Sequence, residues 1–116
     1  TITVVDLVAV EINGSGNVFA EGIDTDSFDA EINGSGNIAP IGEVSELDVA
    51  VNGSGNYNGE RLVAVAGSVL VSGSGSAIVN VTDVLDADVG GSGSIEYLGD
   101  PLVSESVSGS GSVSRR

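Results

Sequence analysis

The chain of 116 residues contains no cysteine, histidine, lysine, methionine or tryptophan. Without cysteine it can form neither a disulfide framework nor a thiolate metal site. Without histidine, lysine or cysteine it also lacks the side chains that most often serve as bases and nucleophiles, so Ser–His–Asp and Ser–Lys arrangements are excluded. Carboxylates are the remaining groups for acid–base chemistry, and we therefore expect that the protein is not an enzyme.

Positive charge is nearly absent as well. Against 17 acidic residues stand only Arg61, Arg115 and Arg116, which gives a formal net charge of −14. Contacts to phosphate need a basic surface, so nucleic acid is excluded as a partner, and an anionic membrane surface is disfavoured. No apolar run approaches the ~18 residues of a membrane span, so we expect no membrane insertion. Residues 1–60 carry eleven acids and no base, whereas residues 61–116 carry six acids and all three arginines.

The dominant feature that is present is the motif Gly-Ser-Gly followed by Asn or Ser. It occurs six times, at intervals of 20, 19, 20, 18 and 18 residues. A fixed period near 20 is typical of stacked repeat architectures. Glycine permits backbone conformations and close approaches that a Cβ atom would prevent. We therefore predict structural turns at Gly14, Gly16, Gly34, Gly36, Gly53, Gly55, Gly73, Gly75, Gly91, Gly93, Gly109 and Gly111.

The residues on both sides of each motif alternate between apolar and polar. Phe28, Ala30 and Ile32 stand six, four and two residues before Gly34, and Ile38 stands four residues after it. A period of two predicts half-buried strands, and no segment has the periodicity of a helix. In several repeats a second glycine turn follows about eight residues after the first, at Gly22, Gly42 and Gly99.

One such repeat cannot bury its apolar face alone, but stacked repeats form continuous parallel sheets around a narrow core. The sequence thus predicts an all-β fold, a right-handed parallel β-helix (β-solenoid) of about six coils with 18–20 residues per coil, in a single domain, residues 1–116. The low aromatic content, 3% against 41% hydrophobic residues, agrees with a thin core. Because the chain starts at Thr1 within a coil, we expect it to be the C-terminal part of a longer or processed precursor.

Polar residues recur in columns beside the turns. Asn17, Asn37 and Asn56 follow the first three motifs, and Ser residues follow the other three. A second column begins with Asn13 and Asn33. Neutral side chains stacked one per coil predict hydrogen-bonded ladders rather than calcium ligands.

Carboxylates form the second set of columns. In the repeat register Glu11 stacks near Glu31 and Asp29 near Asp48, and Asp24 and Asp26 share a loop. The first interpretation is a solvated, aggregation-resistant strand face. Calcium bridging is the alternative, because carboxylates are hard oxygen ligands. The metal-ligand candidates are Asp24, Asp26, Asp29, Glu31 and Asp48, and no other cofactor is expected.

The segments 28–38, 47–57 and 85–95, together with 97–113 and its Gly99-Asp100-Pro101 step, resemble the family called putative auto-transporter adhesin, head GIN domain. The likeness extends over essentially the whole chain. It implies a right-handed β-helix on an exported or surface protein of a bacterium, with an adhesive role and without known catalytic residues.

Three classes of function remain open at this point. The leading interpretation is a non-enzymatic exported or cell-surface module, structural or adhesive, which would be extracellular, on the cell surface or periplasmic. The second is self-assembly end to end into a filament, because uncapped solenoid ends expose strand edges. The third is a β-helix that binds or cleaves a polysaccharide, by analogy with the fold.

Overall fold

The computed structural model describes residues 9–115, and all regular elements in that range are β-strands. The strands are β1 (Ala9–Gly14), β2 (Asn17–Gly34), β3 (Asn37–Gly53), β4 (Asn56–Gly73), β5 (Ser76–Gly91), β6 (Ser94–Leu98), β7 (Leu102–Gly109) and β8 (Ser112–Arg115). Neighbouring strands are parallel, and β1 to β5 follow one another along the stack. The prediction of an all-β, parallel architecture is confirmed.

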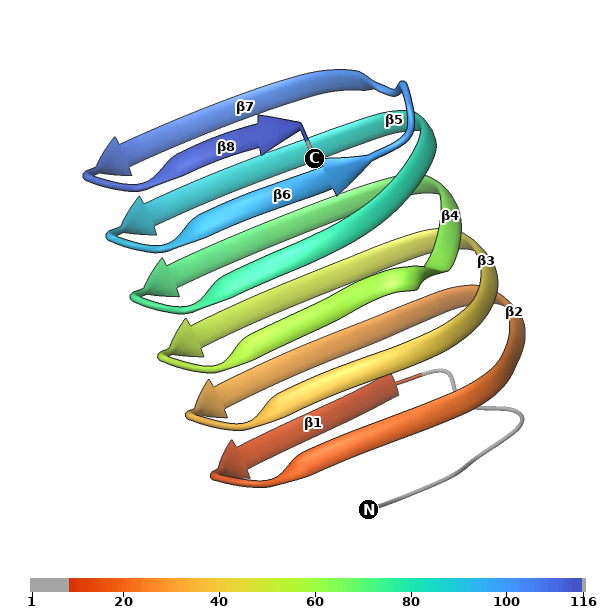
Figure 1. Ribbon diagram of the computed structural model, residues 1–116, viewed down its shortest axis with the longest axis horizontal. Coiled ribbons are helices and arrows are strands. Elements are labelled where there is room, and N and C mark those ends of the chain that lie inside the picture. Colours follow the sequence, from red (N-terminus) through yellow and green to blue (C-terminus); the bar gives the residue numbers. More distant parts are fainter. Residues whose placement is uncertain (1–8, 116) are drawn as a thin grey trace.

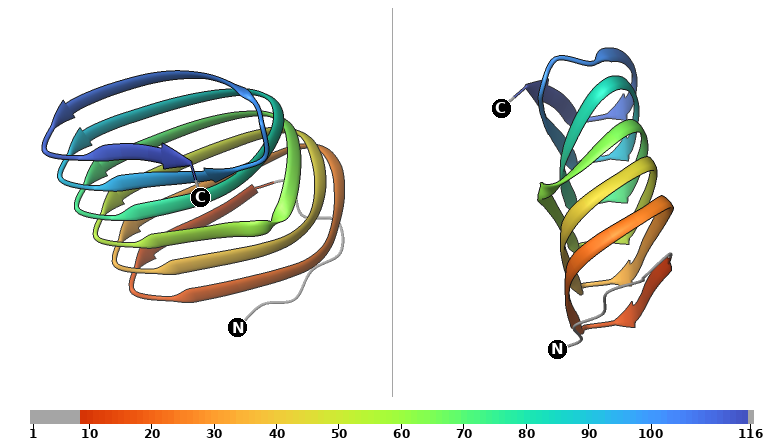
Figure 2. Two further views of the ribbon diagram at one scale, coloured as in Figure 1. Left: turned by 45° about the horizontal axis from the view of Figure 1, so that its top comes forward. Right: turned by 90° about the vertical axis from the view of Figure 1, so that its right-hand side faces the viewer.

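Each long strand makes almost one full turn of a right-handed coil (Figure 1). It starts at a Gly-Ser-Gly corner, runs along one face, bends halfway and returns along the opposite face to the next corner (Figure 2). Six corners bound five complete coils, which is one fewer than the number of motifs. The resulting solenoid is flat, with principal extents of 37 × 32 × 18 Å.

Each coil has two faces, one before and one after the Gly-Ser-Gly corner. The post-corner face comprises residues 17–20, 37–41, 56–63, 76–81, 94–98 and 112–115. The pre-corner face comprises residues 9–14, 27–34, 46–53, 66–73, 84–91 and 102–109. The predicted second glycine turns lie between the faces, where Gly22, Gly42 and Gly99 all have positive φ. Gly22 and Gly42 lie within β2 and β3, so the strand bends there without ending.

The core is a single layer of side chains between the two faces. Inward positions of the pre-corner face carry columns such as Ile32, Val51 and Val71, all fully buried. Large and small residues compensate across the layer. At inward-facing Gly67, for example, an added Cβ would lie 2.9 Å from Val81 of the opposite face. A core this thin has room for aliphatic side chains and little space for rings, as the composition predicts.

The corner glycines are required for two different reasons. The first glycine of each motif has positive φ, +122° at Gly34, which is a conformation that side-chain-bearing residues rarely adopt. The second has an ordinary φ but, from the second motif onward, no space: a Cβ at Gly36 would lie 2.6 Å from the Gly16 carbonyl oxygen of the coil below. The stacked corners also bond to each other, since the backbone N–H of Asn37 donates to that same oxygen over 2.9 Å.

The predicted ladders flank the corners and run along the solvent-exposed surface. Asn37 donates a hydrogen bond to Asn17 over 2.9 Å and accepts one from Asn56 over 3.1 Å. The second column repeats the pattern, because Asn33 donates to Asn13 over 3.2 Å and accepts from Asn52 over 3.2 Å. Each amide therefore satisfies the amide of the adjacent coil and holds the repeats in register.

Candidate functional site: a hollow on the post-corner face

The predicted carboxylate columns exist and lie on the pre-corner face. Glu11 pairs in register with Glu31, and Asp29 pairs with Asp48. A shallow hollow of about 260 Å³ is lined by Asp29, Glu31, Asp48 and the intervening strand residues. Asp26 is exposed in β2, and the side chain of Asp24 lies outside the described part of the chain.

The pKa values of two carboxylates in these columns are shifted in opposite directions by their surroundings. Partial burial, and then the adjacent Asp29 carboxylate, raise the pKa of Asp48 above its ordinary value. The pKa of Glu31 is instead lowered, chiefly because the Asn33 amide donates a hydrogen bond to its carboxylate over 2.9 Å. Among the described residues no three carboxylates converge into a group that could hold a metal ion. Calcium binding by this face therefore stays a prediction.

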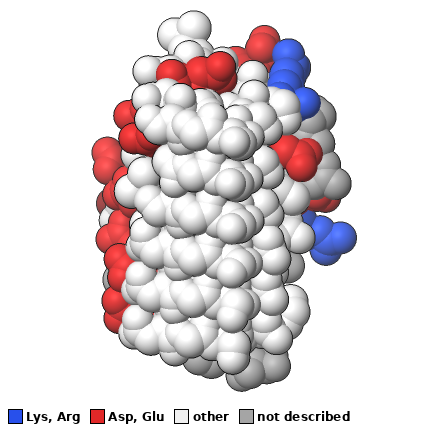
Figure 3. All heavy atoms as spheres, turned by 90° about the vertical axis from the view of Figure 1, so that its left-hand side faces the viewer, with Lys and Arg blue, Asp and Glu red and all other residues white. Residues whose placement is uncertain are grey.

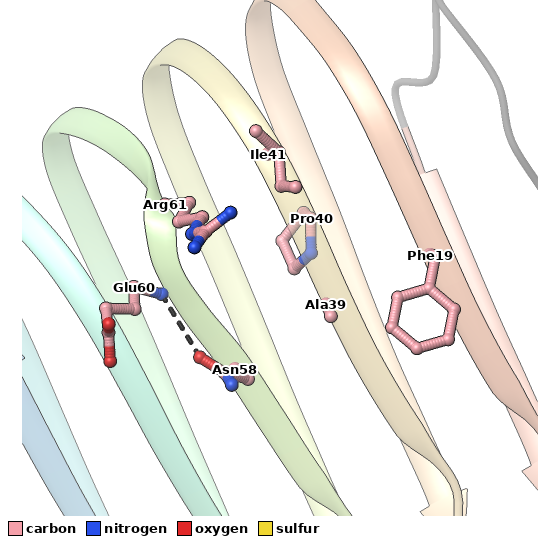
Figure 4. A pocket seen from close by; sticks show the side chains of 7 residues that line it. All are labelled: Phe19, Ala39, Pro40, Ile41, Asn58, Glu60 and Arg61. Carbon is pink, nitrogen blue, oxygen red and sulfur yellow. Dashed lines mark hydrogen bonds between the residues drawn. The ribbon is translucent and has the colours of Figure 1, made fainter.

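A second hollow, of about 300 Å³, opens on the post-corner face (Figure 4). Its floor is formed by β3, and its two sides come from the flanking strands β2 and β4. The lining residues are Phe19, Ala39, Pro40, Ile41, Asn58, Glu60 and Arg61. Of these residues only Arg61 was singled out from the sequence, as one of the three basic residues of the chain. We regard this hollow as the candidate functional site.

The hollow forms where the strand register is broken. Between β3 and β4 the register shifts between Ile38 and Ile41, so that three residues of β4 lie opposite two of β3. Pro40 lies at this point, and proline has no N–H to donate to the sheet. A bulge of this kind bends the strand and redirects its side chains. Here it places Arg61 opposite Ile41, and Arg61 reaches from β4 toward β3 (Figure 4).

The buried side chain of Tyr57 lies next to this bulge in β4. Tyr57 is 1% exposed and is the largest fully buried residue of the core. A Cβ added at Gly59 would lie 2.5 Å from its ring, so the absence of a side chain there makes room for the tyrosine. The Tyr57 hydroxyl is buried without a hydrogen-bond partner among the described residues, and burial raises the pKa of the phenol.

Exposure and charge distinguish this hollow from the rest of the surface. Phe19 is 49% exposed, and it is the one exposed residue among the four aromatic residues of the chain. Seen from the corner edge, acidic side chains gather along one flank, the edge itself is uncharged, and the other flank carries both cationic and acidic side chains (Figure 3). Within the described range Arg115 pairs with Asp100 at 3.6 Å, whereas no described carboxylate forms an ion pair with Arg61.

The fold and the surface together define a small right-handed β-solenoid with a hollow of apolar and charged residues on its post-corner face and carboxylate columns on its pre-corner face. A family model described as putative auto-transporter adhesin, head GIN domain, matches residues 4–101. The chain belongs to this family, as the resemblance implied. No curated protein matches it in sequence. The described residues include no helix long and apolar enough to cross a membrane.

Two solved structures from Parabacteroides distasonis ATCC 8503 are similar to the chain. One is described as a putative lipid binding protein, with 36% sequence identity and a TM-score of 0.89 over 94% of this chain and 45% of that one. The other is described as a putative adhesin, with 31% identity and a TM-score of 0.85 over 98% of this chain and 50% of that one. The chain thus spans about half the length of either protein.

Proposed function

We propose that this chain is a non-enzymatic binding module of an exported bacterial protein, displayed on the cell surface or in the periplasm, which attaches to its target through the post-corner face. Membership of the adhesin family supports export and adhesion. The absence of histidine, lysine and cysteine supports a role without catalysis. The observation that carries the choice of face is the exposed Phe19 ring beside a hollow that also contains Arg61.

An adhesion assay tests this proposal. Beads coated with the protein are allowed to settle on surfaces coated with bacterial or host glycans and are then washed under controlled flow. Beads with the native chain should be retained, and beads with a Phe19→Ala, Arg61→Gln double variant should be lost. An Asp86→Asn variant, changed on the opposite face, is the matched control, and beads that carry it should be retained. Equal retention of native and uncoated beads on every surface would refute the proposal.

End-to-end association is a second candidate, favoured by one observation at the last described coil. Val107 is 41% exposed although its register neighbour Val89 is fully buried, and a second chain stacked on β7 would cover it. Glu105 opposes this, because it occupies the register position of the buried Ala87. Light scattering of concentrated protein, with and without calcium, tests end-to-end association. Glu105→Val should promote association if the glutamate prevents stacking. A monodisperse monomer for both proteins under both conditions would refute end-to-end assembly.

A further inference from the structure

We propose that the hollow between Phe19 and Arg61 binds a single acidic sugar residue, a pyranose with one carboxylate, carried on an otherwise neutral glycan. This inference rests on the proposed adhesive function and names the ligand class for its site.

The aromatic ring supplies a platform. Phe19 projects outward from β2, and its neighbour in register on β3 is the short Ala39. The next strand is β4, so the distance from Phe19 to Asn58 is two strand spacings, about 9–10 Å. Over Ala39 there is thus room for one six-membered ring lying against Phe19. The C–H face of a pyranose is apolar and suits the negative face of an aromatic ring.

The cation supplies recognition of charge. Arg61 is one of three basic residues in the chain, and it faces the same hollow as Phe19. A guanidinium group binds a carboxylate through two parallel hydrogen bonds, which fix its orientation as well as its charge. Among the described carboxylates none forms an ion pair with Arg61. A sugar hydroxyl near the carboxylate would lie within reach of the Asn58 amide on the same strand.

The shape of the hollow favours a sugar over a lipid. Its volume of about 300 Å³ is at the lower limit of the range for small-molecule sites. Polar groups stand along one side, from Asn58 to Arg61, and the Phe19 ring along the other (Figure 4). A long acyl chain gains affinity by enclosure in apolar surface, which a shallow hollow over one strand does not provide.

The surrounding charge restricts the ligand to one carboxylate. Glu60 lines the hollow beside Arg61, and the chain as a whole carries a net charge of −14. Electrostatic repulsion acts over the Debye length of about 8 Å at physiological salt, so a polyanion would be repelled by Glu60 and by the net negative charge of the chain. A single acidic residue in a neutral glycan brings one carboxylate to the guanidinium and no further charge.

Calorimetric titration of the full chain tests the proposal with two matched trisaccharides, one ending in glucuronic acid and the other in glucose. The native protein should bind the acidic trisaccharide about tenfold more tightly than the neutral one, as expected for one charge-assisted contact. Arg61→Gln should abolish this preference, and Phe19→Ala should weaken binding of both sugars. Arg115→Gln removes an arginine outside the hollow and should change neither affinity. Circular dichroism verifies that each exposed-site variant is folded.

Three outcomes would overturn the proposal: equal binding of the two trisaccharides, a preference that survives Arg61→Gln, or stronger binding of palmitate or heparin than of the acidic trisaccharide. The bead assay separates this from the adhesive function. If native beads are retained and free glucuronic-acid trisaccharide does not release them, the ligand class is wrong and adhesion stands. If native beads are not retained on any surface, the adhesive function itself fails.

Discussion

The two faces of the solenoid differ in how regularly their strands pair from coil to coil. On the pre-corner face the pairing between β2 and β3 runs without a break from Ser27 to Gly34, and the following coils continue that register to the corner. On the post-corner face and in the bend, the register shifts between β2 and β3, again between β3 and β4, and twice between β4 and β5. The intervals between successive corners are 20, 19, 20 and 18 residues. The post-corner face and the bend therefore accommodate the differences in coil length.

This difference shows where a repeat protein can vary without losing its stack. Corners cannot vary because their backbones touch, and the pre-corner face contains three inward residues per coil in strict alternation. Extra residues appear instead as bulges on the other face, and a bulge creates local shape. The pre-corner face, which is regular, carries the acidic columns. The post-corner face, which is irregular, carries the hollow with Phe19 and Arg61.

The largest expected effect is at a corner. Gly55→Val introduces a Cβ that overlaps the Gly36 carbonyl oxygen and Ile32, so we expect a loss of about 3 kcal/mol in the free energy of unfolding. Gly90→Ala is the matched control, because a Cβ at Gly90 meets no atom within 4 Å and its φ is not positive. Urea denaturation of both variants measures the difference. Equal midpoints for the two variants would show that corner packing does not restrict the repeat.

A smaller loss is expected in the ladder beside the corner. Asn37→Ala removes the hydrogen bonds to Asn17 and from Asn56, so the free energy of unfolding should fall by about 1 kcal/mol. Asn58→Ala, on the same face but outside the ladder, should change stability less. Thermal unfolding followed by circular dichroism compares them, and a more severe loss in Asn58→Ala would contradict the role assigned to the ladder.

Removal of the Tyr57 hydroxyl, beneath the post-corner face, should stabilise the protein. Tyr57→Phe removes a buried hydroxyl without a hydrogen-bond partner while it keeps the ring that fills the core. A buried unsatisfied polar group costs about 1–3 kcal/mol, so the variant should be more stable by about 1 kcal/mol. Tyr97→Phe, where the ring is only partly buried, is the control and should be near neutral. A loss of stability in Tyr57→Phe would show that the hydroxyl is satisfied in solution.

The smallest effect concerns charge on the regular face. The pKa of Asp48 is raised in the folded chain by partial burial and by Asp29. Stability from its protonation is fully present below the unfolded pKa and is lost as pH rises through the folded pKa, so ionised Asp48 destabilises the fold at neutral pH. Asp48→Asn should raise the urea midpoint at neutral pH, and the gain should vanish in acid. A gain that persists below the unfolded aspartate pKa would exclude this cause.

The repeat was predictable because the corner motif and the core residues both recur periodically in the sequence. Gly-Ser-Gly at a fixed period and the alternation around Phe28 and Ile32 were sufficient for the strands, the parallel stacking and the ladders. The candidate site was not predicted, because it depends on departures from the repeat. Pro40, Gly59 and the unequal spacing of the corners were visible in the sequence. Their combined effect on the position of Arg61 required the register of three adjacent strands.

The central claim is that recognition belongs to the irregular face and that the regular face is structural. The most direct measurement is a backbone NMR titration of the isotope-labelled chain with the glucuronic-acid trisaccharide. We predict that chemical-shift changes are confined to the strands around the hollow, near Phe19, Ala39 and Arg61, and that the signals of the pre-corner face do not shift. Changes centred on Asp29, Glu31 and Asp48 would contradict it, because recognition would then belong to the acidic, regular face.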